Sequence, residues 1–179
     1  MNQSRAYKYP QDSFTETNEI VLPNDTNTLN NLMGGRLLHL MDVTAAIAAQ
    51  KHSGNICVTA AVNNVSFDRA VKLGSALTLQ AKVIRAYRTS MEVQIVVYEQ
   101  EITLGKPKSK CNEAYYTFVA IDEHGEKVVV PEVRPLSDEE KRLYDSALIR
   151  RQLNLLLNGK KAVKEMESLK KQMAGWLEQ

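Results

Sequence analysis

The residues best suited to chemistry lie around one short segment, where the pair Gly34-Gly35 opens a helix-forming run that contains one acid, Asp42. Glycine at a helix start lets another group approach the backbone closely, and the first N–H groups of a helix have no acceptor within it. A carbonyl oxygen docked on the N–H of Gly35 would be polarised, as in an oxyanion hole. The alternative interpretation is a loop-to-helix turn that needs glycine for its geometry alone.

The acid Asp42 has apolar surroundings in the predicted helix. It is the only acid between Asp25 and Asp68, and its helical neighbours are Leu38, Ala45, Ala46 and Ala49. A carboxylate is rarely placed among such residues unless it is paired or functional. We therefore expect Asp42 to act as a general base or a nucleophile. The alternative is an acid at a groove edge that bonds to a backbone amide or a side chain.

The spacing of these groups limits how they can act together. Gly35 and Asp42 are seven residues apart, which is about 10 Å along a helix that rises ~1.5 Å per residue. One carbonyl cannot contact both, so we expect them to come from different chains, with two helices packed around a two-fold axis. Asn31, just before the glycines, could bond to a substrate carbonyl or orient a water, or could simply favour the turn.

The elements that must position these residues are one long helix and several strands. The helix is predicted from Gly35 to His52, with Gly54 as a stop signal, and because it is apolar nearly all round we expect it to be buried. Short connections between the strands imply antiparallel neighbours. The sequence thus predicts an α+β fold in which an antiparallel sheet wraps one long buried helix. The predicted strands cover residues 16–22, 56–67, 76–87, 90–102 and 109–122.

The chain is expected to divide into three parts. Residues 1–15 read as a loose polar lead-in, residues 16–135 as the main domain, and residues 136–179 as a helical extension. In the extension, Ser137 with Glu140 forms a good helix start, and the helix should run to about Leu157. A second amphipathic helix is predicted after Asn158-Gly159. We expect these helices to be an appendage to the catalytic fold.

Composition excludes several classes of protein. Of 179 residues, 44% are hydrophobic, and the net charge of +2 is too small to argue for nucleic acid as a partner. Cys57 and Cys111 are expected to be reduced, buried thiols of a cytoplasmic protein. The three histidines show no metal-binding spacing, so no metal site is predicted. With no apolar signal core and no run of bilayer length, we expect a soluble, unexported protein without membrane contact.

Four segments together resemble the acyl-CoA thioesterase family of hotdog proteins. They are LPNDTNTLNNLMGGRLLHLMD (22–42), VTAAVNNVSF (58–67), YRTSMEV (87–93) and TFVAIDEHGE (117–126), in the family's order. The resemblance covers roughly residues 15–135. The chain departs from the family's pattern at Met33, in the predicted acyl pocket, and at Tyr87, which replaces a glycine before Arg88.

The resemblance implies hydrolysis of the thioester bond of acyl-CoA to a free carboxylic acid and CoA. By the matching positions, Asp42 is the catalytic carboxylate, Asn31 its polar partner across the interface, and Gly35 the backbone donor. Arg88, Thr89 and Ser90 fall where the family binds CoA phosphate or pantetheine, and an arginine with hydroxyls suits a phosphate. No separate cofactor is implied, because CoA is part of substrate and product.

The resemblance also implies a homo-oligomer, at least a dimer and further a hexamer built as a trimer of dimers. The main rival is a non-catalytic hotdog module that binds acyl-CoA as a sensor or scaffold, and the presence of Asp42 argues against it. A hydratase of the same fold would need a histidine as acid or base, and His39 and His52 do not form the expected pairing with an aspartate.

Overall fold

The computed structural model describes residues 5–63, 65, 67 and 69–157. The chain divides into two compact units, Met1–Arg134 and Pro135–Gln179. The first unit carries every sheet and the long helix near the catalytic candidates. The second contains one described helix.

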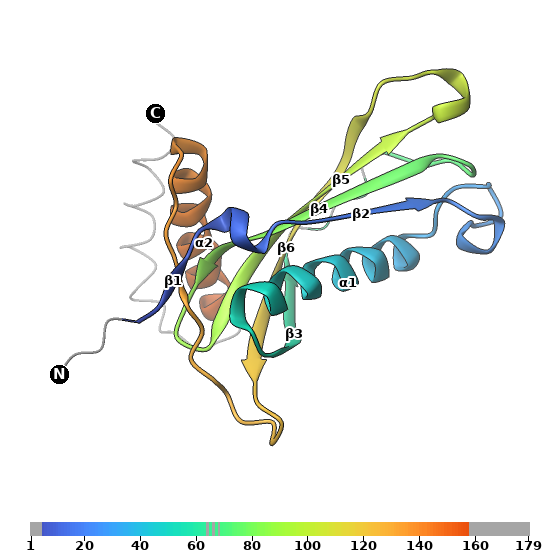
Figure 1. The fold of residues 1–179 in the computed structure, drawn as a ribbon. Helices are drawn as coiled ribbons and strands as arrows, with labels where there is room; N and C mark the ends of the chain where they lie inside the picture. The colour runs from blue at the N-terminus through green and yellow to red at the C-terminus, as the bar shows by residue number, and fades with distance from the viewer. Residues whose placement is uncertain (1–4, 64, 66, 68, 158–179) are drawn as a thin grey trace. The chain divides into compact units, whose positions relative to one another are not determined.

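The first unit is built on a five-stranded antiparallel sheet with the strand order β2-β4-β5-β6-β3 (Figure 1). The strands alternate between buried and more exposed side chains because one face packs on a helix. Strands β2 and β3 form the two edges of the sheet. All five predicted strands are present and pair in antiparallel fashion, so this prediction is confirmed. Their bounds are β2 Thr15–Ile20, β3 Ile56–Asn63, β4 Ala76–Ala86, β5 Ser90–Gln100 and β6 Ser109–Ile121.

Helix α1, Gly34–Ser53, crosses one face of this sheet (Figure 1). Its last turn is closed by Gly54, which adopts a left-handed φ of 70° and donates its N–H to the carbonyl of Gln50 at 2.8 Å. The helix is not buried all round in a single chain: Val43 is 44% exposed and Ile47 is 38% exposed. One sheet covers only one side of a helix, so these residues need another partner. The buried side consists of Leu37, Met41, Thr44, Ala45, Ala48, Ala49, His52 and Ser53.

The segment before the main sheet is more ordered than the expected loose lead-in. Strand β1, Tyr7–Lys8, pairs in parallel with β7, Glu132–Val133. A 3-10 turn, η1 Pro10–Ser13, follows β1, and the buried Ser13 hydroxyl accepts the N–H of Val83 at 2.9 Å. That bond satisfies a backbone donor where β4 has a bulge. Further 3-10 turns are η2 Pro23–Asp25 and η3 Ile102–Leu104.

The second unit contains helix α2, Asp138–Leu157. Its start is the predicted capping box: the hydroxyl of Ser137 accepts the N–H of Glu140, and the Glu140 carboxylate accepts the N–H of Ser137, both at 3.1 Å. The helix continues to the last described residue, Leu157, so its predicted end stays a prediction. The second helix predicted for the extension lies outside the described residues.

His52 is a buried titratable group at the end of α1. Its Nε2 donates to the carbonyl of Pro131 at 2.9 Å, so Nδ1 carries the lone pair, and Nδ1 is buried without a partner among the described residues. Burial lowers the pKa of His52, and the positive charges of Lys8 and Arg5 lower it further, against the bond to Pro131. The ring is therefore held neutral.

This neutral ring predicts a pH dependence of stability. Because the pKa of His52 is lower in the folded state, the unfolded chain binds the proton more tightly. The contribution of His52 to the free energy of unfolding is therefore highest above the ordinary pKa of 6.5 and decreases as the pH falls below it. We expect the wild type to lose more stability than His52→Gln between pH 7.5 and 5.5, since glutamine can still donate to Pro131. Urea unfolding at the two pH values measures this. Equal losses in both proteins would contradict it.

Candidate functional site

The start of α1 is held by a short loop that leaves the helix donors open. The backbone carbonyl of Asp25 accepts the N–H of Met33 at 2.9 Å, and its carboxylate pairs with Arg36 at 2.7 Å. Met33 provides no side-chain cap. Within the described part of the chain, the N–H groups of Gly34, Gly35 and Arg36 therefore have no protein acceptor. Such a helix end favours a negatively charged or polarisable oxygen.

A cavity of about 330 Å³ lies against this helix start. The two glycines differ in their surroundings: a Cβ on Gly34 would meet the ring of Phe67 at 3.2 Å, whereas a Cβ on Gly35 would point into open space. Gly34 is thus needed for packing, and Gly35 leaves room beside the helix for a ligand. The cavity is lined by Asn27, Asn31, Leu32, Gly34, Leu37, Phe67, Arg69, Ala70 and Val71.

Two asparagines share the cavity wall, and only Asn31 was singled out from the sequence. The Oδ1 of Asn27 accepts the N–H of Leu29 at 2.9 Å and of Asn31 at 3.2 Å. These two bonds commit the oxygen of Asn27 to the loop and fix the orientation of its amide. The NH₂ group of Asn27 is then available as a donor. The signal that could have identified it is the Thr26-Asn27 pair that begins the family's motif.

Asp42 lies about two helical turns beyond Gly35 along α1 and is half-buried. Its Oδ1 accepts the hydroxyl of Thr59 at 2.7 Å, from the edge strand β3. A bulge between Thr59 and Ala61 interrupts the pairing of β3 with β6 at this point, and bulges re-aim side chains. In the sequence, Thr59 reads as one more residue of an alternating strand and gives no sign of this contact.

Tyr116 of β6 lies beneath the same stretch of α1. It is 1% exposed, and its hydroxyl donates to the carbonyl of Leu38 at 3.3 Å, one turn before Asp42. Burial, and then the negative charge of Asp42, raise the pKa of Tyr116 to about 12. The phenol therefore stays neutral. The carboxylate of Asp42 accepts a hydrogen bond from Thr59, and its negative charge acts on Tyr116.

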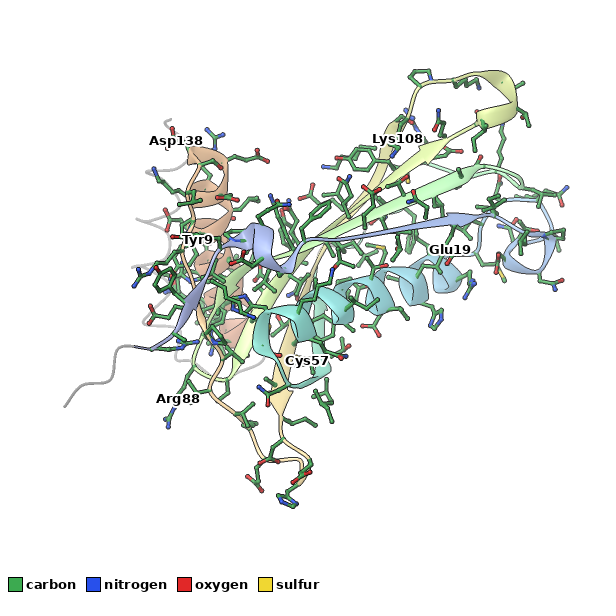
Figure 2. The ribbon with its side chains drawn as sticks, viewed as in Figure 1. Tyr9, Glu19, Cys57, Arg88, Lys108 and Asp138 are labelled. Carbon is green, nitrogen blue, oxygen red and sulfur yellow. The ribbon has the colours of Figure 1, made fainter. Side chains whose placement is uncertain are left out.

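The predicted CoA-binding turn lies elsewhere in the chain. Arg88 and Thr89 lie in the turn between β4 and β5, and Ser90 is the first residue of β5. The carbonyls of Arg88 and Thr89 accept the N–H groups of Val130 and Ala120. The side chain of Arg88 is exposed, and Figure 2 places it at the opposite end of the sheet from the start of α1. Within one chain, this turn is not brought together with Gly35.

Comparison with known proteins decides the family. The model of the thioesterase superfamily matches residues 29–106. The uncharacterized acyl-CoA thioester hydrolase YkhA of Bacillus subtilis is 32% identical over 79% of this chain and 84% of its own length. The chain belongs to the hotdog-fold acyl-CoA thioesterase family. Acyl-coenzyme A thioesterase 11 of Mus musculus is 36% identical over 87% of the chain, which spans about a quarter (26%) of that longer protein.

Solved structures of this thioesterase family confirm the hotdog fold. A hexameric acyl-CoA thioesterase in its apo form matches with a TM-score of 0.79 and 37% identity, over 82% of this chain and 94% of that one. An acyl-CoA hydrolase of Staphylococcus aureus in complex with butyryl-CoA, CoA and CoA disulfide matches with a TM-score of 0.77 and 34% identity. The match covers 97% of this chain and 99% of that chain. Neither described helix of the present family member is long and apolar enough to cross a membrane.

The two glycines give a matched test of the site's geometry. Replacing Gly35 by alanine should stabilise the protein by up to about 1 kcal/mol, because alanine is the better helix former and its methyl group meets nothing. Gly34→Ala should gain less or lose stability, because its methyl group presses on Phe67. Urea unfolding of both variants measures the difference. A Gly34→Ala protein as stable as Gly35→Ala would show that Phe67 does not pack on the helix start.

Proposed function

We propose that the protein hydrolyses the thioester bond of acyl-CoA and releases a carboxylic acid and CoA. The observation that carries the proposal is a pair of features on one helix. The N–H donors at the start of α1 have no acceptor among the described residues, and the carboxylate of Asp42, further along α1, is held by the hydroxyl of Thr59 from β3. Membership of the acyl-CoA thioesterase family supports it. CoA enters as part of the substrate, and no separate cofactor is proposed.

Each site residue receives one role. The N–H of Gly35 polarises the thioester carbonyl and stabilises the oxyanion that develops in the transition state. Asp42 acts on water as a general base, or attacks the carbonyl carbon to give a mixed anhydride that water then opens. On either route the C–S bond breaks and CoA leaves as a thiolate that takes up a proton. Thr59 orients the Asp42 carboxylate by its hydrogen bond.

The asparagines position the carbonyl or the water. Asn31 was assigned this role from the sequence, and we propose Asn27 beside it, because its amide orientation is fixed by two backbone donors. Structures of the S. aureus hydrolase include alanine variants at an asparagine, an aspartate and a threonine. Those three residues follow in the same order and at the same separations as Asn27, Asp42 and Thr59, which supports the assignment of all three.

Two chains are proposed to complete each site. Gly35 and Asp42 are about 10 Å apart along α1, too far for one carbonyl to contact both. Helix α1 contacts the edge strand β3. The helix exposes Val43 and Ile47, and the strand exposes Ile56, Val58 and Val62. An unpaired strand edge flanked by apolar residues favours association with a second copy. A hexameric relative supports assembly of such dimers into a trimer.

The turn Arg88–Ser90 is proposed to bind CoA phosphate or pantetheine, as the family motif implies. In an assembly this turn can serve a site whose carbonyl is held by another chain. We also propose the cytoplasm as the compartment. Cys57 and Cys111 are buried free thiols, which suits a reducing environment, and a rat relative of 26% identity is a cytosolic acyl-CoA thioester hydrolase.

Asp42→Asn tests the chemistry. The change keeps size and hydrogen bonding and removes the negative charge, so kcat for an acyl-CoA should fall by about 10²–10⁴-fold, the usual cost of a lost general base. Thiol release over a series of acyl-CoAs measures turnover. The control is Asp138→Asn, which removes an exposed carboxylate from α2 and should leave kcat unchanged. An Asp42→Asn enzyme with near-normal turnover would end the catalytic assignment.

Mixed assemblies test whether the site is shared. Combining Asp42→Asn chains with Asn31→Ala or Asn27→Ala chains should restore part of the activity, because some interfaces then pair an intact carboxylate with an intact asparagine from the other chain. If proven mixed dimers regain nothing, the two groups act from one chain.

The proposed contact surface has its own test. Ile47→Lys places a charge among the apolar residues of α1 and β3 and should shift the protein towards monomers and reduce turnover, because the sites are completed across the contact. The control Val129→Lys introduces the same charge at another exposed residue. Light scattering measures the mass. An Ile47→Lys protein of unchanged mass would exclude this surface as the contact.

A further inference from the structure

A second cavity, of about 290 Å³, adjoins the cavity at the start of α1. The two cavities share Arg69 and Ala70 in their walls. The second is rich in charge, with cations at Arg69, Lys72 and Lys106, carboxylates at Glu99 and Glu101, and the hydroxyl of Ser109. A ligand at the helix start could therefore extend into a charged cavity without leaving the chain.

Two of the three cations are available to a ligand. Lys106 is paired with Glu101 at 2.6 Å, and the buried Glu99 accepts the hydroxyl of Ser75 at 2.9 Å. Arg69 donates to the neutral hydroxyl of Ser109 at 3.0 Å. Among the described side chains, no carboxylate lies within ion-pair distance of Arg69 or Lys72. Both side chains are exposed, so an anion can reach their charges.

The backbone fixes Lys72 against the helix-start loop. Asn31 and Lys72 form an antiparallel bridge. Leu32 donates its N–H to Val71 at 2.8 Å, and Leu73 donates to Asn30 at 3.0 Å. The segment that carries the cations is thus joined to the segment that precedes Gly34. Their relative position does not depend on side chains alone, which is the preorganisation that a binding site needs.

We propose that this second cavity binds an anionic oxygen group of the same acyl-CoA whose carbonyl sits at the start of α1, through Arg69 and Lys72. The proposal rests on the proposed function. Arginine and lysine beside a hydroxyl suit phosphate or carboxylate oxygens, arginine by its two-pronged geometry and lysine as a point charge. The anion is either a phosphate of CoA or a carboxylate at the far end of the acyl chain.

The location distinguishes this site from the Arg88 turn. Arg88 lies at the opposite end of the sheet from the start of α1 (Figure 2), whereas Arg69 lines the helix-start cavity itself. One chain can therefore hold both the carbonyl and an anionic group of one substrate.

Binding of CoA, which needs no turnover, tests the phosphate source. We would measure the Kd of CoA and of pantetheine, which has no nucleotide phosphates, by calorimetry on the wild type, Arg69→Gln, Lys72→Gln and Arg88→Gln. The control Lys108→Gln removes an exposed charge between the cavity residues Pro107 and Ser109, at a residue that does not itself line the cavity. Phosphate binding predicts a CoA Kd raised at least about tenfold by Arg69→Gln and Lys72→Gln. The Kd of pantetheine and the control should not change.

The carboxylate source is tested by comparing butyryl-CoA with glutaryl-CoA, whose acyl chain ends in a carboxylate. It predicts that the two variants leave the CoA Kd unchanged and lower kcat/KM for glutaryl-CoA at least about tenfold relative to butyryl-CoA. If both variants change neither quantity, or only Arg88→Gln weakens CoA, the proposal is overturned. A wild type that binds CoA and hydrolyses no acyl-CoA would refute the proposed function and leave the CoA result standing.

Discussion

The open N–H groups at the start of α1 are the feature on which the rest of the site depends. A helix start normally satisfies its donors with a side-chain cap, and here Met33 provides none. The loop is instead fastened by Asp25, whose backbone and side chain hold Met33 and Arg36. These bonds stabilise the loop without occupying the helix donors. The N–H groups at the helix start therefore remain available to a ligand.

A second constraint follows from the straightness of the helix. The proposed catalytic carboxylate, Asp42, is on the same helix as the donors, and the helix keeps them apart. Val43 and Ile47 are exposed on α1, and β3 is an edge strand of the described sheet; we propose that a second helix brings its own donors to this surface. Residues that a monomer would bury are thereby left for assembly, so the proposed chemistry and the proposed association have one structural cause.

Much of this arrangement could be predicted from the sequence, because its signals are local. Alternation in the strands, the stop at Gly54 and the capping box at Ser137 each depend on neighbouring residues. The pairing of Tyr7–Lys8 with Glu132–Val133 could not be predicted, since two-residue strands show no periodicity and their partners are distant in the sequence. Thr59 was not identified because its bond to Asp42 accompanies a bulge that the sequence does not reveal. Asn27 lies in the matching segment, but the loop bonds that orient its amide are visible only in the structure.

The bulge in β3 separates what the strand contributes to the fold from what it contributes to the site. Ala60 is the extra residue: Thr59 is opposite Phe118 and Ala61 is opposite Thr117, so Ala60 has no partner of its own in the ladder. A chain shortened by this one alanine could keep every other pairing and every buried side chain of the strand. It would lose the local twist that accompanies a bulge, and with it the aim of Thr59 at Asp42. In β3, the types of residue determine how the strand pairs, and the one extra residue determines where the Thr59 hydroxyl points.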